Sequence, residues 1–179
     1  MGRNIEIKAR VADPKRLRSL AAAAADSPAV LIEQHDTFYN TSRGRLKLRR
    51  QNGRPAELIW YLRPDSRDPV PSDYSIAKVS DPGSVDRALA AARGRRGVVA
   101  KRRSLLLSGR TRIHLDEVEG LGHFLELEVV LKPGESVESG RREAESLMAS
   151  LEIGESDLLE SAYIDLLVAA DSDGPGRGR

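Results

Sequence analysis

The sequence predicts an α+β domain built around an antiparallel sheet or a closed barrel. Seven or eight segments show the two-residue alternation of strands, most are joined by short turns, and a few helical segments lie between them. A sheet with this many strands in 179 residues can remove its exposed edges most economically by closing on itself. The helices are then expected to pack on its outside.

Composition narrows the class of protein. The chain is 40% apolar and 31% charged, and its 29 Lys and Arg nearly balance its 27 Asp and Glu, so the net charge does not demand a nucleic acid or an acidic membrane as partner. The absence of cysteine excludes disulfides, thiolate metal sites and thiol nucleophiles. No apolar stretch approaches the ~18 residues of a membrane helix, and no apolar signal segment precedes the first strand. The cytoplasm is the expected location.

The N-terminal part of the chain contains four predicted strands and one helix. Residues 4–11 alternate apolar and polar side chains strictly, which is the pattern of a half-buried strand. A helix is expected to begin after Asp13, with proline at its first position, and to end at Asp26. Three further strand-like segments cover residues 30–40, 44–51 and 57–63.

The C-terminal part continues this mixture. Residues 65–72, rich in Pro and Asp, are expected to form a mobile loop before a weaker strand at 74–79. Helices are expected at 81–94, 136–151 and 156–167, and strands at 98–108, 110–116 and 123–131. Residues 1–170 would form one domain, and 171–179, composed of Gly, Pro, Ser and charged residues, a disordered tail.

Several strands carry ionisable groups at nearly every position of their polar face. These groups are Glu6, Lys8, Arg10, Arg45, Lys47, Arg49, Lys101, Arg103, Arg112, His114, Asp116, Glu126 and Glu128. For any one strand, a solvated face is the more ordinary interpretation. Because the opposite faces are apolar and the first three helices each have an apolar stripe to cover them, we expect the charged faces to converge inside a barrel. Charges in such a place must pair or bind a ligand.

These charges suit a polyanion together with a metal. Lysine and arginine side chains can hold phosphoryl oxygens, and carboxylates supply the hard oxygen ligands that Mg²⁺ or Mn²⁺ prefers. Phosphoryl transfer requires little beyond positioning, charge neutralisation and an oriented nucleophile. The inventory therefore predicts chemistry on a phosphorylated substrate.

Several segments resemble the CYTH superfamily, the triphosphate tunnel metalloenzymes that include class IV adenylate cyclase and thiamine triphosphatase. The segments that carry the resemblance are Glu6-Ile7-Lys8, Leu46-Lys47-Leu48-Arg49, Lys101-Arg102-Arg103, the highly specific run from Arg112 to Val129, and Ser161 to Leu167. The resemblance spans about residues 4–167. It implies an eight-stranded antiparallel tunnel that binds a triphosphate through basic residues and a metal through acidic ones.

Roles follow from the resemblance position by position. It implies catalytic roles for Glu6 and Lys8. The implied phosphate-binding residues are Lys8, Arg10, Lys47, Arg49, Arg63, Lys101, Arg103 and Arg112, and the implied ligands of Mg²⁺ or Mn²⁺ are Glu6, Asp116, Glu126 and Glu128. One position departs from the family's E-x-E-x-K signature, because Asn4 replaces its first Glu. An amide can still coordinate a hard cation through oxygen but contributes no charge, so a weaker site or a single ion is expected.

Two functions remain open. The first is a metal-dependent enzyme that hydrolyses inorganic, thiamine or nucleoside triphosphate, or cyclises ATP to cAMP. The second is a non-catalytic protein that binds polyphosphate, nucleotide or nucleic acid and whose metal site is eroded at Asn4. The carboxylates among the basic residues favour the enzyme, since a nucleic-acid binder has no use for them. We expect a small triphosphate as partner, no membrane, and a monomer or homodimer.

Other candidate residues carry less weight. The chain has no G-x-x-x-x-G-K-[ST] sequence, so a P-loop enzyme is excluded. His114 should face the tunnel, but one histidine is no zinc site, and His35 and His123 are expected at turns or on the surface. Tyr39 and Trp60 are expected mainly to pack in the core.

Overall fold

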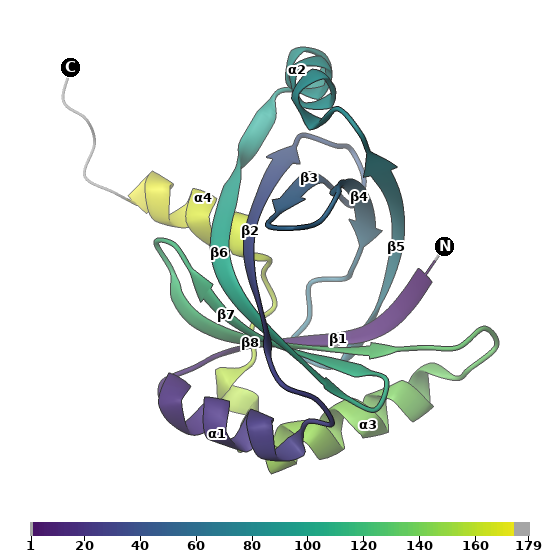
Figure 1. The fold of residues 1–179 in the computed structure, drawn as a ribbon, viewed down its shortest axis with the longest axis vertical. Helices are drawn as coiled ribbons and strands as arrows, with labels where there is room; N and C mark the ends of the chain where they lie inside the picture. The colour runs from purple at the N-terminus through teal and green to yellow at the C-terminus, as the bar shows by residue number, and fades with distance from the viewer. Residues whose placement is uncertain (1, 174–179) are drawn as a thin grey trace.

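Eight antiparallel strands form a closed barrel in the computed structural model, which describes residues 2–173 (Figure 1). Around the barrel the strands follow the order β1-β5-β4-β3-β2-β6-β7-β8. Their bounds are β1 Gly2–Arg10, β2 Val30–Tyr39, β3 Arg45–Gln51, β4 Ala56–Leu62, β5 Val70–Val79, β6 Arg95–Ser108, β7 Thr111–Val118 and β8 Gly122–Val130. The predicted antiparallel and closed architecture is confirmed.

Within the described residues the helices are α1 Pro14–Ala24, α2 Pro82–Arg93, α3 Val137–Ser150 and α4 Tyr163–Asp173, with a short 3₁₀ turn at Glu155–Asp157. Helices α1 and α2 begin at the aspartates that the sequence marks as caps. Asp13 accepts from the backbone N–H of Lys15 and Arg16, and Asp81 accepts from that of Ser84. Each cap is followed by a proline, whose missing N–H costs nothing at a helix start.

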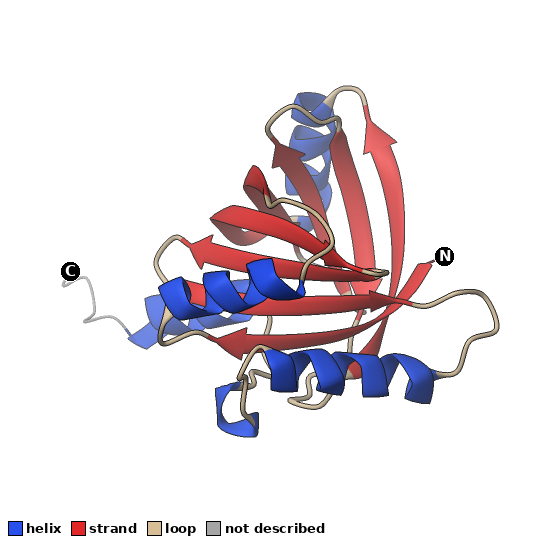
Figure 2. Cartoon of the chain, turned by 60° about the horizontal axis from the view of Figure 1, so that its bottom comes forward, coloured by secondary structure: helices blue, strands red, loops and turns tan. Residues whose placement is uncertain are grey.

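Helices α1 and α3 cover the apolar outer face of one half of the barrel (Figure 2). Ile7 and Ala9 of β1 share a buried cluster with Leu17 of α1 and Met148 of α3. Burying a large side chain such as Ile7, Leu17 or Met148 contributes about 1.5–3 kcal/mol. This burial determines which face of β1 is turned outward. Since side chains alternate along a strand, Glu6 and Lys8 must then point into the barrel.

Gly140 lets α3 approach β1 closely. A Cβ atom at this position would lie 2.7 Å from side-chain atoms of both Ile5 and Leu131. Any larger residue would push the helix off the sheet or force those two buried side chains to move.

Helix α2 stands at the far end of the long strands β2, β5 and β6 instead of covering the apolar face (Figure 1). None of its residues within the described chain is buried, so the expectation that the second helix covers the barrel is wrong. Asp86 ties α2 to the sheet by accepting hydrogen bonds from the Tyr39 hydroxyl at 2.7 Å and from Arg95. Trp60 is only half-buried, and its indole N–H donates to the Arg43 carbonyl at 3.1 Å, so it does not lie in the core as expected.

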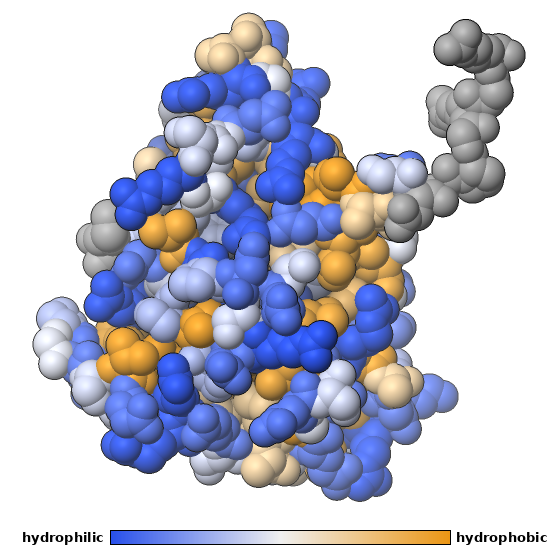
Figure 3. All heavy atoms as spheres, turned by 180° about the vertical axis from the view of Figure 1, so that it is seen from behind, coloured by the Kyte–Doolittle hydropathy of each residue, from blue (hydrophilic) through white to orange (hydrophobic). Residues whose placement is uncertain are grey.

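Helix α4 packs beside β6 and buries its first turn. Tyr163 and Ile164 join Phe124 of β8 in a second buried cluster, with the two aromatic rings 4.9 Å apart. The helix continues to Asp173, three residues into the segment expected to be a disordered tail, and residues 174–179 lie outside the described chain. The face seen from behind is largely hydrophilic, with apolar side chains gathered beside the start of the grey C-terminal trace (Figure 3).

Strand β5 begins earlier than its sequence pattern indicates. It starts at Val70, within the expected loop, and pairs Val70 with Glu6 and Ser72 with Asn4. These pairs join β5 to β1 and close the barrel. Among the described residues, no helix is both long and apolar enough to cross a membrane.

Candidate functional site

All eight strands contribute side chains to one cavity inside the barrel. It contains about 880 Å³ of space free of protein atoms, a volume that includes open solvent at its mouth. The basic residues described as lining it are Lys8, Arg45, Lys47, Arg49, Arg63, Lys101, Arg103 and Arg112, and the acidic ones are Glu6, Asp36, Glu126 and Glu128. Eight cations against four carboxylates leave the lining four charges positive, so it attracts an anion.

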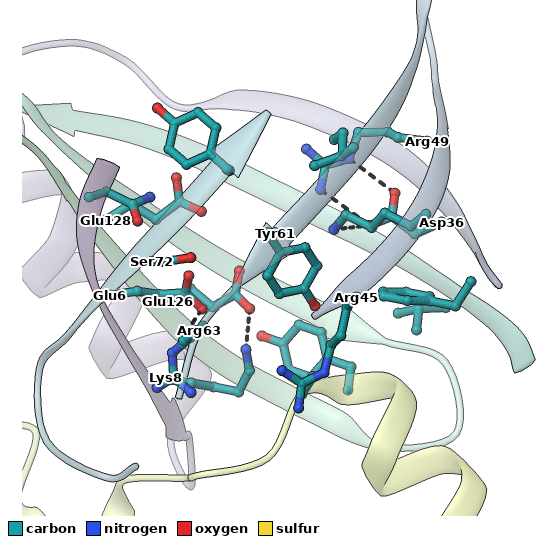
Figure 4. A pocket seen from close by; sticks show the side chains of 18 of the residues that line it. Glu6, Lys8, Asp36, Arg45, Arg49, Tyr61, Arg63, Ser72, Glu126 and Glu128 are labelled. Atoms are coloured by element: carbon teal, nitrogen blue, oxygen red, sulfur yellow. Dashed lines mark hydrogen bonds and ion pairs between the residues drawn. The ribbon is translucent and has the colours of Figure 1, made fainter. Parts of the chain in front are cut away.

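The acidic group of the cavity is assembled by strand register. β1 and β8 pair Glu6 with Glu128 and Lys8 with Glu126, and β7 adds Arg112 opposite Glu128. Directly opposed side chains on one face of a sheet lie ~4.5–5.5 Å apart at Cβ. Glu6 and the two glutamates of β8, which are distant from it in sequence, therefore meet on one wall of the barrel, as Figure 4 shows.

Neighbouring cations hold two of these carboxylates ionised. The Lys8 ammonium and the Arg103 guanidinium both donate to Glu126, while Arg112 Nη1 donates to Glu128 at 2.9 Å. Burial alone would raise the pKa of Glu126, but Lys8, Lys101 and Arg103 outweigh burial and bring it well below its usual value. Glu6 differs, since burial dominates there and raises the pKa of its carboxyl.

A second charged group, centred on Asp36 of β2, faces the acidic wall across the cavity (Figure 4). Its buried carboxylate accepts from Lys47 Nζ at 2.7 Å, from Arg49 Nε at 3.0 Å and from the Gln34 amide at 2.9 Å. Burial, followed by repulsion from Arg49, lowers the pKa of Lys47 to about 8. Asp36 thus fixes two cations whose remaining N–H groups are available to a ligand.

The segment leading into α4 closes one side of the cavity. Arg63 donates to the Glu160 carbonyl at 3.0 Å and lies 3.4 Å from Glu6, and Arg45 donates to Asp165 at 2.7 Å. Because these guanidinium groups already have protein partners, their availability to phosphate depends on exchanging those partners.

Tyr163 supports the floor of the cavity. Lys8 Nζ lies 4.2 Å and Lys101 Nζ 4.8 Å from the centre of its ring, so both ammonium groups gain a cation–π contact. Its hydroxyl donates to Asp116 at 3.1 Å. Neither Tyr163 nor Asp36 was a predicted site residue; inward alternation along residues 30–40 was the one signal for Asp36.

Most predicted site residues meet in the cavity, but Arg10 and Asp116 do not line it. Arg10 is exposed at the end of β1, with its guanidinium 5.0 Å from the Phe124 ring centre. Asp116 is buried behind the wall and accepts from Arg103 Nε at 2.6 Å and Lys101 Nζ at 2.8 Å. The structure therefore shows Asp116 as a residue that positions Lys101 and Arg103, two of the cations of the cavity.

The donor set on the acidic wall fits a divalent cation. Glu6, Glu126 and Glu128 offer carboxylate oxygens, and the buried Asn4 also lines the cavity. Within the described residues, the Asn4 side-chain oxygen has no hydrogen-bond partner. Buried polar atoms are rarely left unpaired, so an oxygen of this kind facing the cavity is consistent with a ligand there.

Comparison with known proteins places the chain among barrels of this kind. The sequence model of the CYTH domain matches residues 2–163, whereas a search of curated proteins finds no match. A solved structure from Pyrococcus horikoshii is 24% identical, covers 91% of this chain and 98% of its own, and gives a TM-score of 0.80.

Two further solved structures carry functional descriptions. A protein from Vibrio parahaemolyticus, proposed to be an adenylate cyclase, is 19% identical over 92% of this chain and 97% of its own, with a TM-score of 0.74. A Hippeastrum protein, proposed to be an adenylyl cyclase and described as having a dominant triphosphatase activity, is 16% identical over 96% of both chains, with a TM-score of 0.64. Identities this low establish a shared fold only.

Proposed function

The chain belongs to the CYTH domain family, and we propose on this basis that it is a metal-dependent enzyme acting on a triphosphate. The reaction is hydrolysis of inorganic, thiamine or nucleoside triphosphate, or cyclisation of ATP. One observation carries the proposal: a single barrel cavity brings eight basic side chains together with a wall of three glutamates. Basic residues alone would serve binding, whereas Glu126 and Glu128 add a place for a metal.

Different residues of the cavity would bind the anionic substrate and the metal cation. Arg49, held by Asp36, faces the wall that carries Glu126 and Glu128 (Figure 4), and Lys47, also held by Asp36, lines the same cavity. Lys47 and Arg49 would bind phosphoryl oxygens. Glu126 and Glu128 would hold Mg²⁺ or Mn²⁺. When bound, the ion would neutralise charge on the phosphoryl oxygens.

Glu6 is suited to accept a proton. Burial raises the pKa of its carboxyl, which makes it a stronger base than an ordinary glutamate. In hydrolysis, the oxygen of water forms a bond to the terminal phosphorus while the bond from phosphorus to the bridging oxygen breaks. Glu6 would take the water proton, and the bridging oxygen would leave with the electron pair beside cations such as Lys8.

A screen of phosphate release and cAMP formation tests this function. Tripolyphosphate, thiamine triphosphate and ATP are each supplied with Mg²⁺ and with Mn²⁺, and at least one combination is expected to turn over. Binding without turnover in every combination would instead favour the non-catalytic alternative.

Replacing Arg49 with Ala should weaken triphosphate binding by about 1.5–3 kcal/mol, the usual contribution of a charge-assisted hydrogen bond. Asp36 would keep Lys47 and Gln34 as partners, so the change is not expected to unfold the wall. Calorimetric titration with tripolyphosphate in a chelator measures the loss without interference from turnover. Arg18→Ala, on the exposed face of α1, is the control and should have no effect. Equal, small effects at both positions would show that Arg49 does not contact the phosphates.

Asn4→Glu is expected to lower the metal concentration that gives half-maximal activity. Asn4 and Glu6 lie on the same face of β1, about 7 Å apart along the strand. A carboxylate at Asn4, whose side chain lines the cavity, adds charge where a divalent ion is expected. The shift should be larger for Mg²⁺ than for Mn²⁺, which tolerates mixed ligands better.

Titration of both metals against wild type, Asn4→Glu and Asn4→Gln measures the effect of charge separately from that of length. Asn4→Gln lengthens the side chain without adding charge and should not lower the midpoint. Unchanged midpoints in Asn4→Glu would place position 4 outside the metal site.

A further inference from the structure

His114 is a buried histidine that the proposed chemistry leaves without a role. It lies on β7 between Arg112 and Asp116, with its side chain on the inner face of the barrel and only 4% of the residue exposed. Its Nδ1 atom has no hydrogen-bond partner among the described residues. An unpaired polar atom in such a place is uncommon and calls for a ligand or a partner.

The surroundings of this nitrogen have the geometry of a metal site. Nδ1 lies 3.8 Å from Oε2 of Glu126 and 3.8 Å from Oε1 of Glu128. Both distances are too long for a hydrogen bond. A tetrahedral ion with bonds of ~2.0–2.1 Å separates its ligand atoms by about 3.4 Å, so both distances from the histidine are within about half an ångström of those in such a site.

The three atoms converge. One ligand atom from each of His114, Glu126 and Glu128 lies within 4.8 Å of the others. Register explains the convergence, since β7 and β8 pair His114 with Glu126 and Arg112 with Glu128. The two glutamates line the cavity and His114 does not, so an ion bound here would keep its cavity side open to a substrate oxygen.

We propose that His114 is a nitrogen ligand of the metal held by Glu126 and Glu128, and that this site prefers a transition ion of the Co²⁺ or Zn²⁺ class to Mg²⁺. The proposal rests on the proposed function only in assigning the two glutamates to a metal. Imidazole suits Zn²⁺ and its neighbours in the first transition row, whereas Mg²⁺ prefers oxygen ligands and keeps its waters. Catalytic zinc sites have three protein ligands and an open fourth position, and two carboxylates with one imidazole would supply three ligands.

The small number of histidines in the chain simplifies a test of this ligand assignment. It has three histidines, so an imidazole ligand other than His114 could come only from His35 or His123. Both of those side chains are exposed. His35→Gln and His123→Gln are therefore matched controls for the buried substitution His114→Gln.

Two measurements on the substrate-free, tag-free protein need no turnover. Pulsed electron paramagnetic resonance of the Mn²⁺-loaded wild type should show coupling to an imidazole ¹⁴N that disappears in His114→Gln and persists in both controls. Calorimetric titration should show that His114→Gln weakens Co²⁺ binding by about tenfold or more but Mg²⁺ binding by less than about threefold.

Either of two results would overturn the assignment. Absence of the nitrogen coupling in wild type would do so without any variant, and so independently of whether the variant folds. Equal weakening of Co²⁺ and Mg²⁺ in His114→Gln would show that the histidine merely orients the glutamates. Triphosphate turnover by the wild type with Mg²⁺ is scored separately, so failure of the proposed function and failure of the nitrogen ligand remain distinguishable.

Discussion

Replacing Glu128 with Gln is expected to abolish turnover of the triphosphate while leaving the barrel folded. The amide oxygen can still accept the hydrogen bond that Arg112 Nη1 gives Glu128 at 2.9 Å, so the local structure should persist. The charge that would hold the metal is lost, however. A metal contributes several kcal/mol of transition-state stabilisation, and each 1.4 kcal/mol is tenfold in rate, so the loss should be on the order of 100-fold or more.

Glu117→Gln is the matched control. Glu117 also lies in the β7–β8 region and accepts from an arginine, Arg102, at 2.9 Å, but this pair is exposed on the outer face. The two variants therefore lose the same charge from the same kind of ion pair on opposite faces of the barrel. The rate at saturating metal and the thermal midpoint are measured for both. Normal turnover by a folded Glu128→Gln protein would remove Glu128 from the metal site.

The same change at Glu126 is expected to have the same effect on turnover but a less simple effect on stability. Its carboxylate accepts from both Lys8 and Arg103, which are themselves buried. Glu126→Gln would leave these cations with one fewer negative partner, and an uncompensated buried charge destabilises the folded state. Glu128 is for this reason the sharper test.

The two-residue alternation in the sequence was sufficient to predict which way most side chains face. It placed Glu6, Lys47, Arg103 and Glu128 on the inner face, and the structure brings all four into one cavity. On the half of the barrel that α1 and α3 cover, this success has a physical cause: the apolar residues of the outer face are buried under helices, which turns the charged faces inward.

The two-residue alternation predicts which face of a strand a side chain lies on, but not where it lies along the barrel axis. This explains why sequence reasoning expected Arg10 and Asp116 in the site although neither lines the cavity. Arg10 alternates with Glu6 and Lys8 as predicted, but it lies at the exposed end of β1, beyond the cavity. Asp116 also faces inward, yet two cations already hold it behind the wall. Asp36 was not predicted as a site residue, because the segment around it lacks the dense charge of the other strands. Which acid supports a cation and which faces a ligand depends on strand register, and periodicity does not carry that information.

The elements that were placed least accurately depend on tertiary contacts. The Pro-rich segment before residue 74 reads as a loop, but Val70 and Ser72 pair with β1 and complete the barrel. Helix α4 likewise extends beyond the expected end of the last helix at Leu167, to Asp173. For β5 the partner strand stabilises a conformation that local propensity alone does not favour, whereas residues 168–172 of α4 are exposed.

Asp36→Asn should reduce the free energy of unfolding by about 3 kcal/mol, because removing one partner of a buried ion pair leaves its cations uncompensated. Asp36 is 2% exposed and accepts hydrogen bonds from both Lys47 and Arg49. These cations hold the pKa of Asp36 well below its usual range against the effect of burial, which would raise it. A depressed pKa stabilises the folded state above the ordinary aspartate range and loses that effect only in strong acid, so the full contribution is present at neutral pH. Urea unfolding at pH 7 measures the difference.

A triphosphate should reverse much of this loss, because its oxygens can supply the negative charge that the variant lacks. If Lys47 and Arg49 bind phosphate, tripolyphosphate should raise the unfolding midpoint of Asp36→Asn more than that of wild type, since a ligand that binds only the folded state stabilises it in proportion to its affinity. Glu152→Gln breaks the Arg16–Glu152 pair, in which both side chains are at least half exposed, and serves as the control. Because exposed ion pairs contribute little, it should leave the stability nearly unchanged and show no added response to the ligand. A variant destabilised at Asp36 that tripolyphosphate stabilises no more than wild type would show that Asp36 holds a purely structural ion pair, and that the phosphates bind elsewhere in the cavity.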